Sequence, residues 1–294
     1  MLDGLLVIDK PAGMTSHDVV ARVRRAAGQR RVGHAGTLDP DATGVLLVGL
    51  GRVTRLLRFL QGASKAYRTT VVFGVATDTL DAAGVVLERR TMEVSLEAVT
   101  AATRRFVGEI DQLPPMVSAV QVGGRRLHEI ARAGETVERT PRRVRIDRID
   151  VEGLEPGPFP VATLFVECGT GTYIRALAAD LGEALGGCAH VQTLRRTRVG
   201  SFTIDEARPL DEVEADVAEA LMSPRDAMRD LAEAPADAET ARGVAHGTVF
   251  PAAALEPSVA APGPFAVVGP EGDLLAVYER RGETLKPAVV VVAS

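Results

Sequence analysis

Aromatic, sulfur-containing and lysine residues are scarce in this chain of 294 residues, which has no tryptophan, three tyrosines, two cysteines and three lysines. Cys168 and Cys188 stand without the CxxC or CxH companions that zinc sites use, and two isolated cysteines give no disulfide framework. We therefore expect two reduced, buried thiols and no structural zinc.

Long apolar runs are also missing. Prolines at 251, 257, 262 and 264 interrupt the Ala/Val-rich C-terminal part, so no stretch approaches the length of a membrane span. Residues 5–8 are too short for the apolar region of a signal peptide, and no basic segment precedes them. A cytoplasmic location without membrane association is therefore the default expectation.

Several motifs of cofactor and metal chemistry are absent. The sequence contains no HExxH, no Walker loop, no GxGxxG after a predicted strand and no GxSxG elbow. The histidines have no paired metal spacing, and Asp78 with Asp81 does not supply the ligands of a calcium loop. We expect neither a metal ion nor a nucleotide cofactor, and a serine or cysteine nucleophile is left open.

The net charge of −5 hides an uneven distribution. Residues 205–239 contain twelve acidic and three basic residues, so this segment alone carries −9. Residues 1–204 carry 27 Lys or Arg against 22 Asp or Glu, a balance of +5, and eight arginines fall in residues 125–148. Because phosphate binding depends on local potential, a basic RNA-binding face is compatible with residues 1–204. A solvated arginine-rich surface is the alternative interpretation.

Residues 33–44 are the most informative stretch of the sequence. They include three glycines, which allow a tight turn or a close approach to a ligand. Pro40 pushes the preceding Asp39 toward an extended backbone, and the apolar residues 45–48 predict a buried strand. A carboxylate on a stiff loop before a core strand is well placed for chemistry. An isolated Asp-Pro pair, by contrast, is most often only a turn.

The hydrophobic pattern predicts an α+β fold around a largely antiparallel sheet. The acidic segment 205–239 is expected to form surface helices or a linker, and short strands beyond about residue 240 predict a small β-rich domain. We place the domains at residues 1–237 and 238–294. Strands are expected at 3–8, 65–73, 143–151, 161–168 and 188–198, and helices at 16–27 with Ser16 as N-cap, 53–60, 95–107, 125–133 and 169–185.

Five residues of the central loop, His34, Gly36, Leu38, Asp39 and Gly44, resemble the catalytic motif of the TruB family of tRNA pseudouridine synthases. The likeness covers about residues 4–205. Gln121 and His128 depart from the lysine and tyrosine that are usual in the family. Further segments that resemble family motifs, in the family's order, are residues 9–16, 65–68, 114–120, 171–175 and 194–196.

This resemblance implies the pseudouridine synthase fold with a PUA-like C-terminal domain, and an isomerase that converts uridine 55 in the T loop of tRNA to pseudouridine. Asp39 is then the essential carboxylate. The other implied site residues are Tyr67, which stacks on uracil, Arg175, which pairs with Asp39, Tyr173 and the Leu194 backbone, which hold the base, His34, which lies near the flipped nucleotide, and Lys10 of the first motif.

The implied reaction adds no atoms to its substrate and therefore needs no cofactor. The implied partner is the T-arm stem-loop of tRNA; no protein partner is implied, and we expect a monomer. Two other classes stay open. One is a noncatalytic tRNA-binding or tRNA-folding protein with the same fold. The other is a carboxylate-dependent hydrolase of nucleosides, which would release free base.

Overall fold

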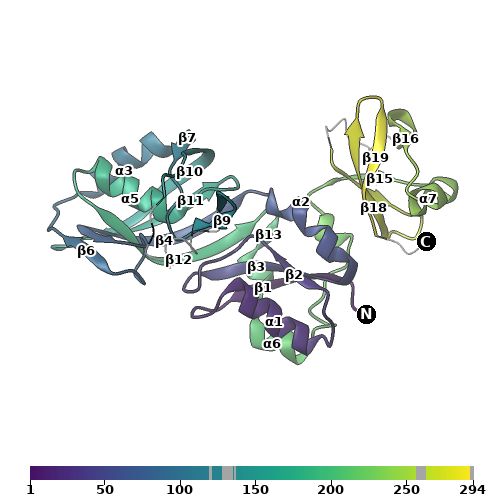
Figure 1. The fold of residues 1–294 in the computed structure, drawn as a ribbon, viewed down its shortest axis with the longest axis horizontal. Coiled ribbons are helices and arrows are strands. Elements are labelled where there is room, and N and C mark those ends of the chain that lie inside the picture. Colours follow the sequence, from purple (N-terminus) through teal and green to yellow (C-terminus); the bar gives the residue numbers. More distant parts are fainter. Residues whose placement is uncertain (119–120, 128–134, 136, 256–262, 292–294) are drawn as a thin grey trace. The chain divides into compact units, whose positions relative to one another are not determined.

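The computed structural model describes residues 1–118, 121–127, 135, 137–255 and 263–291 (Figure 1). The chain forms two compact units, and each is described by itself below. The first comprises Met1–Pro40, Val45–Gln61 and Gly200–Ser294, and the second comprises Asp41–Gly44 and Gly62–Val199.

The first unit contains several strands that are hydrogen-bonded in one sheet, and the helices α1 and α6, which lie side by side (Figure 1). The first strand, β1 (Gly4–Lys10), pairs in parallel with the two-residue strand β14 (Arg208–Pro209) from the acidic segment. The strand after the first helix, β2 (Val32–Ala35), pairs antiparallel with the apolar strand β3 (Thr43–Leu50). Apart from its first residue the apolar strand is buried, as predicted from residues 45–48. These elements are β1 (Gly4–Lys10), α1 (Ser16–Ala26), β2 (Val32–Ala35), β3 (Thr43–Leu50), β14 (Arg208–Pro209) and α6 (Leu210–Ala215).

Helix α1 begins one residue away from the predicted cap. Its N-cap is Thr15, which accepts the Asp18 N–H, while the Asp18 carboxylate accepts the Thr15 N–H. This reciprocal pair is a capping box, and it satisfies two backbone donors that a helix start leaves open. Ser16, the predicted cap, is therefore free to make a different contact. Gly28 follows the helix with φ +60, as expected for a residue that ends a helix.

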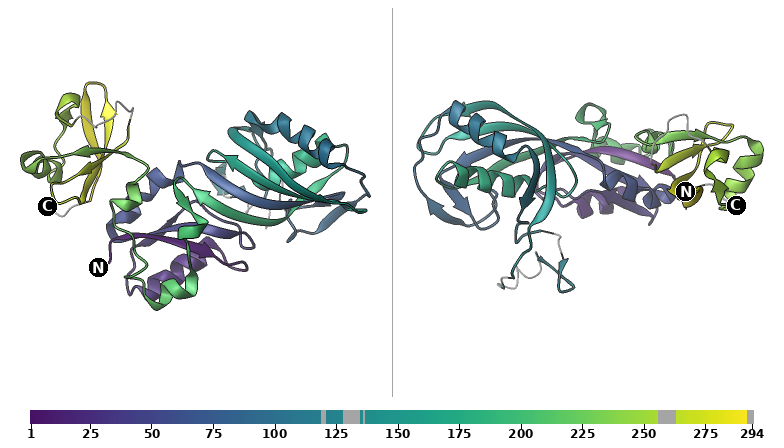
Figure 2. Two further views of the ribbon diagram at one scale, coloured as in Figure 1. Left: turned by 180° about the vertical axis from the view of Figure 1, so that it is seen from behind. Right: turned by 90° about the horizontal axis from the view of Figure 1, so that it is seen from above.

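The second unit is built on five antiparallel strands in the order β12-β4-β11-β10-β7. Helix α5 packs against β12 and helix α3 against β10, and the two helices contact each other (Figure 2). A Cβ at Gly182 of α5 would lie 2.4 Å from the Ala189 nitrogen, so this packing requires glycine. The bounds are β4 (Lys65–Phe73), α3 (Leu96–Thr103), β7 (Gly108–Gln112), β10 (Arg142–Glu155), β11 (Val161–Cys168), α5 (Ile174–Ala184) and β12 (Ala189–Val199).

Most predicted strands and the α+β class are confirmed, but two helix predictions fail in part. The predicted helix at 53–60 consists of the 3-10 turn η1 (Gly51–Arg55) followed by the short α2 (Leu57–Gln61). The helix predicted from 125 is wrong at its start, because β9 (Arg125–Arg126) pairs with β8 (Gln121–Val122) across two glycines with positive φ. Of the remaining predicted residues, 128–133 lie outside the described part. Within the described part, no helix is both long and apolar enough to span a bilayer.

The C-terminal part of the first unit is β-rich, as expected. Its five strands follow the order β15-β17-β18-β19-β16 around a core that contains Phe265, Leu275 and Tyr278. Because β15 already pairs with β17, this sheet includes residues before the predicted boundary at 238, which stays a prediction. The bounds are β15 (Ala232–Pro235), α7 (Ala238–Ala245), β16 (Phe250–Pro251), β17 (Phe265–Val268), β18 (Leu274–Arg281) and β19 (Thr284–Val290).

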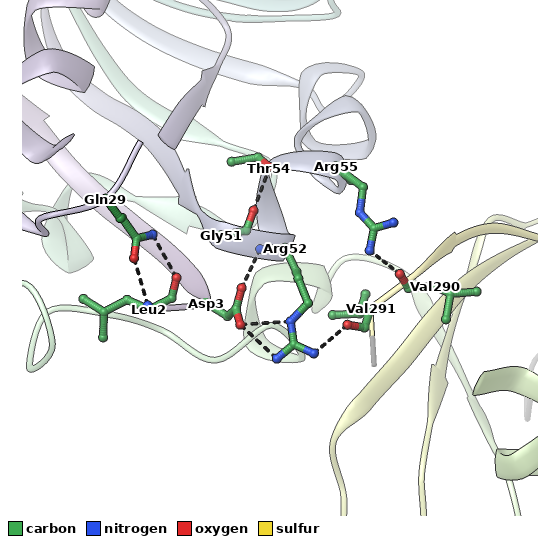
Figure 3. Close-up of polar contacts among 9 residues, drawn as sticks. All are labelled: Leu2, Asp3, Gln29, Gly51, Arg52, Thr54, Arg55, Val290 and Val291. Atoms are coloured by element: carbon green, nitrogen blue, oxygen red, sulfur yellow. Dashed lines mark hydrogen bonds and ion pairs between the residues drawn. The ribbon is translucent and has the colours of Figure 1, made fainter. Parts of the chain in front are cut away.

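Three arginines spaced three residues apart along η1 and α2 donate to main-chain carbonyls at the C-terminal end of this sheet. Arg52 donates to the Val291 carbonyl at 2.8 Å and also pairs with Asp3, and Arg55 donates to the Val290 carbonyl (Figure 3). Arg58 donates to the Ala288 carbonyl at 3.0 Å. The first unit therefore joins its N-terminal and C-terminal segments through guanidinium groups.

Candidate active site

The loop that carries Asp39 is fixed on both sides of this residue. Before it, the Ser16 hydroxyl accepts the Leu38 N–H at 2.9 Å and donates to the Leu38 carbonyl at 3.2 Å. After it, the Pro40 carbonyl accepts from Lys10 Nζ at 2.8 Å and from the Gly13 N–H at 3.0 Å. The half-buried Asp39 is thus held by the backbone tethers of its two neighbours.

Lys10 is fully buried, and its ammonium donates hydrogen bonds to main-chain carbonyls. Besides the bond to Pro40, its Nζ donates to the carbonyls of Pro11 at 2.9 Å and Met14 at 2.6 Å. A buried ammonium is tolerated only when acceptors offset its desolvation, and three carbonyls match its three N–H donors. This geometry gives Lys10 a role in positioning the loop. Its contact with substrate stays a prediction.

His34 lies on β2, five residues before Asp39, and is half-buried. Its ring meets the ring of His17 edge to face, with 5.1 Å between centroids. His17 belongs to the first turn of α1, next to Ser16, so the same turn contacts both β2 and the loop that follows it.

The end of the loop requires glycine at position 44. Gly44 has φ +100, and a Cβ there would lie 2.1 Å from the Arg196 carbonyl oxygen. In the parallel pairing of β3 with β12, Gly44 is opposite Arg196 and Thr43 is opposite Arg195. The Arg195 guanidinium also donates to Thr43 Oγ1 at 3.2 Å. The glycine of this motif therefore serves close backbone packing against β12.

Tyr67 lies on β4 among buried positive charges. It is 9% exposed and is directly opposite Arg196 of β12, itself 1% exposed, so the two side chains share one face of the sheet. Lys65, two residues earlier on β4, is also buried. Burial, reinforced by repulsion from Arg196, lowers the pKa of Lys65 to about 8. A tyrosine ring at such a position can stack on a planar ligand such as a base.

Arg175 stands in the first turn of α5 and joins two loops. Its guanidinium donates to the carbonyls of Thr79 at 2.8 Å and Val117 at 2.9 Å, and it is 4% exposed. Asp81 Oδ2 lies 3.6 Å from the same guanidinium. Within the second unit, Asp81 is therefore a carboxylate partner of Arg175. The pairing of Arg175 with Asp39 stays a prediction.

Tyr173 is the N-cap residue of α5, and the buried Gln112 side chain binds both its backbone N–H and its backbone carbonyl. Gln112 Oε1 accepts the Tyr173 N–H at 2.8 Å, and Gln112 Nε2 donates to the Tyr173 carbonyl at 3.0 Å. The predicted Leu194 is half-buried on β12, where it pairs with Thr69 of β4. Both predicted residues thus stand on rigid elements of the second unit.

The predicted site residues fall into two groups, and the structure ties each group to its own unit. Three positioning residues escaped the sequence analysis. Ser16 was in a quoted motif but was interpreted as a cap, Asp81 was considered only as a metal ligand, and Gln112 gave no signal. His128 and residues 119–120 of a motif lie outside the described part. The first unit holds Lys10, His34 and Asp39, and the second holds Tyr67, Tyr173, Arg175 and Leu194.

Within the described part of the arginine-rich segment 125–148, several arginines pair with nearby acids. On β10, Arg143 pairs with Glu109 at 3.2 Å, Arg145 with Asp147 at 2.6 Å, and Arg148 with Asp150 at 2.7 Å. These side chains are exposed, which fits the solvated-surface interpretation. Phosphate binding by this segment stays a prediction.

Thiols and metal ligands do not gather at either group. Cys168 is buried, and burial raises the pKa of its thiol to about 11, whereas Cys188 is half-buried and not fully buried as expected. Among the described residues, no group of three or more His, Cys, Asp or Glu side chains could hold a metal ion.

Two family models cover most of the chain. The N-terminal domain of TruB family pseudouridylate synthases matches residues 24–174, and the C-terminal domain of tRNA pseudouridylate synthase B matches residues 175–234. A protein called tRNA pseudouridine synthase B from Thermobifida fusca is 46% identical over 100% of both chains. A protein of the same name from Symbiobacterium thermophilum is 50% identical over 84% of this chain and 82% of that protein.

Solved structures show the same fold. A crystal structure of a Cbf5-Nop10-Gar1 complex contains a chain with a TM-score of 0.78 and 24% identity, covering 99% of this chain and 85% of that chain. An H/ACA RNP bound to a substrate RNA containing 2′-deoxyuridine gives a TM-score of 0.76 at 23% identity, over 98% and 85%. With its loop motif, fold and full-length relatives in agreement, the chain belongs to the TruB family of pseudouridylate synthases.

Proposed function

We propose that this chain isomerises uridine 55 in the T loop of tRNA to pseudouridine, with Asp39 as the essential carboxylate. The observation that carries the proposal is the double tether of the Asp39 loop, by Ser16 before it and Lys10 after it. Fixing a reactive group in one geometry lowers the entropic part of a barrier, and two buried polar side chains are spent on this loop. A turn that only reverses the chain direction does not need two buried polar side chains to fix it.

In the proposed reaction the N1–C1′ bond of uridine breaks, the uracil turns in the pocket, and C5 joins C1′. The proton on C5 leaves and N1 gains one, so no atoms are gained or lost overall and no cofactor takes part. Asp39 attacks or assists at the sugar or the base. Keeping the detached uracil in one pocket makes the second bond formation effectively unimolecular.

The remaining residues receive the roles that the resemblance to the family implies. Tyr67 stacks on the uracil, and a stacked base gains about 1–3 kcal/mol, which offsets much of the cost of flipping it. Arg175 pairs with Asp39 and keeps it ionised. Tyr173 and the Leu194 backbone hold the base, and His34 fills space beside the flipped nucleotide. The β-rich C-terminal part is a PUA-like RNA-binding domain that helps to hold the tRNA.

The alternative is a tRNA-binding or tRNA-folding protein that performs no chemistry. This alternative has no need of a carboxylate at position 39, whereas isomerisation does. The two functions therefore differ in what they predict for Asp39.

The test uses a T-arm RNA labelled with tritium at C5 of the target uridine and the protein alone. Loss of tritium with no mass change beyond the isotope identifies isomerisation, because a C5 methyltransferase would need a methyl donor. We expect Asp39→Asn to abolish tritium release while RNA binding is kept, since the variant preserves shape and removes charge. Wild-type protein that binds this RNA and releases no tritium would overturn the catalytic role for uridine 55.

A further inference from the structure

The buried Thr69 of β4 holds a main-chain group of the neighbouring strand β12. Its side chain is 1% exposed, and its hydroxyl donates to the Thr193 carbonyl at 2.7 Å. The two strands pair antiparallel in the sheet of the second unit (Figure 1). This side-chain hydrogen bond therefore adds to the main-chain ladder that joins the two strands.

The carbonyl that Thr69 holds lies where β12 departs from regular pairing. The register with β4 shifts between Val191 and Thr193, so that Gln192 is the extra residue of a bulge. A β-bulge disrupts the ladder locally and bends the strand that contains it. The peptide group that follows the bulge is therefore fixed less firmly by the ladder, and the Thr69 hydroxyl supplies an additional constraint.

The same peptide group contains the N–H of Leu194. The C=O and the N–H of a trans peptide point in opposite directions. Because the Thr193 carbonyl is turned toward Thr69 on β4, the Leu194 N–H is directed to the other side of β12. The strand on that side is β3.

This side of β12 is also the side of the catalytic loop. The pairing of β3 with β12 begins at Thr43, which is opposite Arg195. Because the two strands are parallel, Leu194 is level with the residue before Thr43, in the last part of the loop that carries Asp39. The segment Asp41–Gly44 belongs to the second unit, so this relation is internal to that unit. The Leu194 N–H is thus directed toward the end of the loop at which the base is proposed to react.

We propose that Thr69 is a positioning residue, which orients the Thr193–Leu194 peptide so that the Leu194 N–H donates to a carbonyl oxygen of the flipped uracil. The inference rests on the proposed function, which supplies the base, and it deepens the role given there to the Leu194 backbone. Thr69 itself touches no reacting atom. Its effect reaches the base through one peptide group, which turns as a rigid unit because it is planar. A donor that is fixed in advance needs no reorganisation when the base enters.

The chain offers matched variants for the test. Thr69→Val removes the hydroxyl and keeps the shape of the side chain, whereas Thr69→Ser keeps the hydroxyl. The hydroxyl of Thr70, the next residue on β4, meets the Thr193 hydroxyl at 2.7 Å, so Thr70→Val removes a contact to the same residue without releasing its peptide group. Thr103→Val on α3 removes another buried hydroxyl that donates to a main-chain carbonyl, that of Thr100 at 2.9 Å.

The main experiment measures equilibrium binding of T-arm RNA in an Asp39→Asn background, so that no chemistry disturbs the equilibrium. Three RNAs carry uridine, 2-thiouridine or 4-thiouridine at the target position, because sulfur accepts hydrogen bonds more weakly than oxygen. With Thr69 intact, we expect one of the two thio substitutions to weaken binding by about threefold or more. Thr69→Val is expected to abolish this difference between the RNAs, whereas Thr69→Ser, Thr70→Val and Thr103→Val keep it.

Single-turnover tritium release by variants that retain Asp39 gives a second measurement. For Thr69→Val we expect the rate constant at saturating RNA to fall by about tenfold, because the base is no longer held in the reactive geometry. The affinity for the unmodified T-arm RNA is expected to change by less than about twofold, because phosphate contacts supply most of it. Thr69→Ser is expected to restore most of the rate.

Retention of the thio effect in Thr69→Val, or its equal loss in Thr69→Val and Thr70→Val, overturns the inference. So does equal binding of all three RNAs when Thr69 is intact, because the Leu194 N–H then donates to neither oxygen. If Thr69→Val melts well below Thr103→Val, Thr69→Ala takes its place. Absence of tritium release by wild type together with the expected thio pattern defeats the proposed function alone, whereas release without the thio pattern defeats this inference alone.

Discussion

Ser16 carries more of the site than its size suggests. Its hydroxyl satisfies both the N–H and the carbonyl of Leu38, and it is fully buried. Ser16→Ala leaves two buried main-chain groups without this partner, a cost of about 1–3 kcal/mol. We expect kcat for tritium release to fall by about tenfold or more with a smaller change in KM, because the loop that positions Asp39 loses one of its two tethers. Single-turnover kinetics with the T-arm RNA measures this.

The matched control is Ser223→Ala. Ser223 exchanges two hydrogen bonds with Asp226 on an exposed turn, so its loss also costs stability. It lies outside the proposed site, and kcat is expected to stay at the wild-type value. A comparable fall of kcat in both variants would show that general destabilisation, and not the Leu38 tether, limits the reaction.

Lys65 predicts a pH dependence of stability. Its pKa in the folded chain is lowered from 10.5 to about 8, so between these pH values the unfolded chain binds more protons and stability rises with pH. The penalty for the buried ammonium is present in full below pH 8 and amounts to about 3 kcal/mol. Lys65→Met should therefore stabilise the protein most at pH 7 and progressively less toward pH 10.

Urea midpoints of wild type and Lys65→Met at pH 7 and pH 9.5 test this. Comparing the two chains at each pH removes most of the opposite contribution of Cys168, whose raised pKa lowers stability above pH 9. What remains is the electrostatic interaction between Cys168 and Lys65. Equal differences at both pH values would mean that the ammonium of Lys65 carries no burial penalty. The exposed Lys286→Met controls for the loss of a lysine.

At the scale of single residues, the sequence proposed candidate site residues but could not give their hydrogen-bond partners. Asp39, Tyr67 and Arg175 were recognisable from their motifs, but the contacts that hold them involve residues far away in the chain. Gln112 and Tyr173 are 61 positions apart, and nothing in residues 108–112 marks a positioning glutamine. Ser16 was visible, yet local capping preferences favoured a cap, and Thr15 with Asp18 filled that role better.

Among the elements, the junction of the catalytic loop with β12 gives the sharpest prediction. An alanine at position 44 would have φ +100 and a Cβ 2.1 Å from the Arg196 carbonyl oxygen. The left-handed backbone alone costs about 1–2 kcal/mol, and the clash adds to it because strand backbones cannot move apart freely. We expect Gly44→Ala to lower the melting temperature strongly and to abolish tritium release.

Gly186→Ala is the control for backbone strain without a clash. Gly186 also has a positive φ, +81, but a Cβ there meets nothing within 4 Å. Only the modest strain cost of about 1–2 kcal/mol is expected, with activity retained. Similar melting temperatures for the two variants would mean that close packing at Gly44 is unimportant.

Elements with a strong period were predictable, and those decided by tertiary contacts were not. The alternating residues of β11 and the apolar run of β3 were recognised because burial of one or both faces leaves a clear pattern. The stretch from Gly51 to Gln61 has helical composition but splits into a 3-10 turn and a short helix. The hairpin of residues 121–126, by contrast, is local: Gly123 and Gly124 turn the chain back, as their sequence suggested, and place Arg125 and Arg126 in a strand and not in the predicted helix.

In the whole molecule, the C-terminal sheet has a hydrophobic core of its own. Tyr278 is completely buried in this core, and its hydroxyl donates to the Thr248 carbonyl at 2.9 Å. Tyr278→Ala is expected to cost about 3–5 kcal/mol within this sheet. Calorimetry should then show a separate early transition, with kcat on a short T-arm RNA close to wild type. A single lowered transition would indicate one cooperative unit.

The sequence could also predict the class of the whole molecule but not its division. The pattern of strands and helices predicted an α+β fold with a β-rich C-terminal part, and the resemblance implied a pseudouridine synthase; the fold class and the family are both confirmed. The division into compact units was out of reach, because residues 41–44 pack with a segment that begins at residue 62, and residues 200–294 return to the N-terminal strands. Such long-range contacts leave no local pattern.

The burial of two lysines has a practical consequence for labelling. Lys10 is fully buried, Lys65 is 7% exposed, and only Lys286, near the start of the last strand β19, is exposed. An amine-reactive dye applied to the folded chain therefore attaches at Lys286 and at the α-amino group, and under unfolding conditions at all three lysines. Peptide mapping distinguishes the two patterns, so a fluorescent reporter can be placed on the C-terminal sheet without changing the sequence.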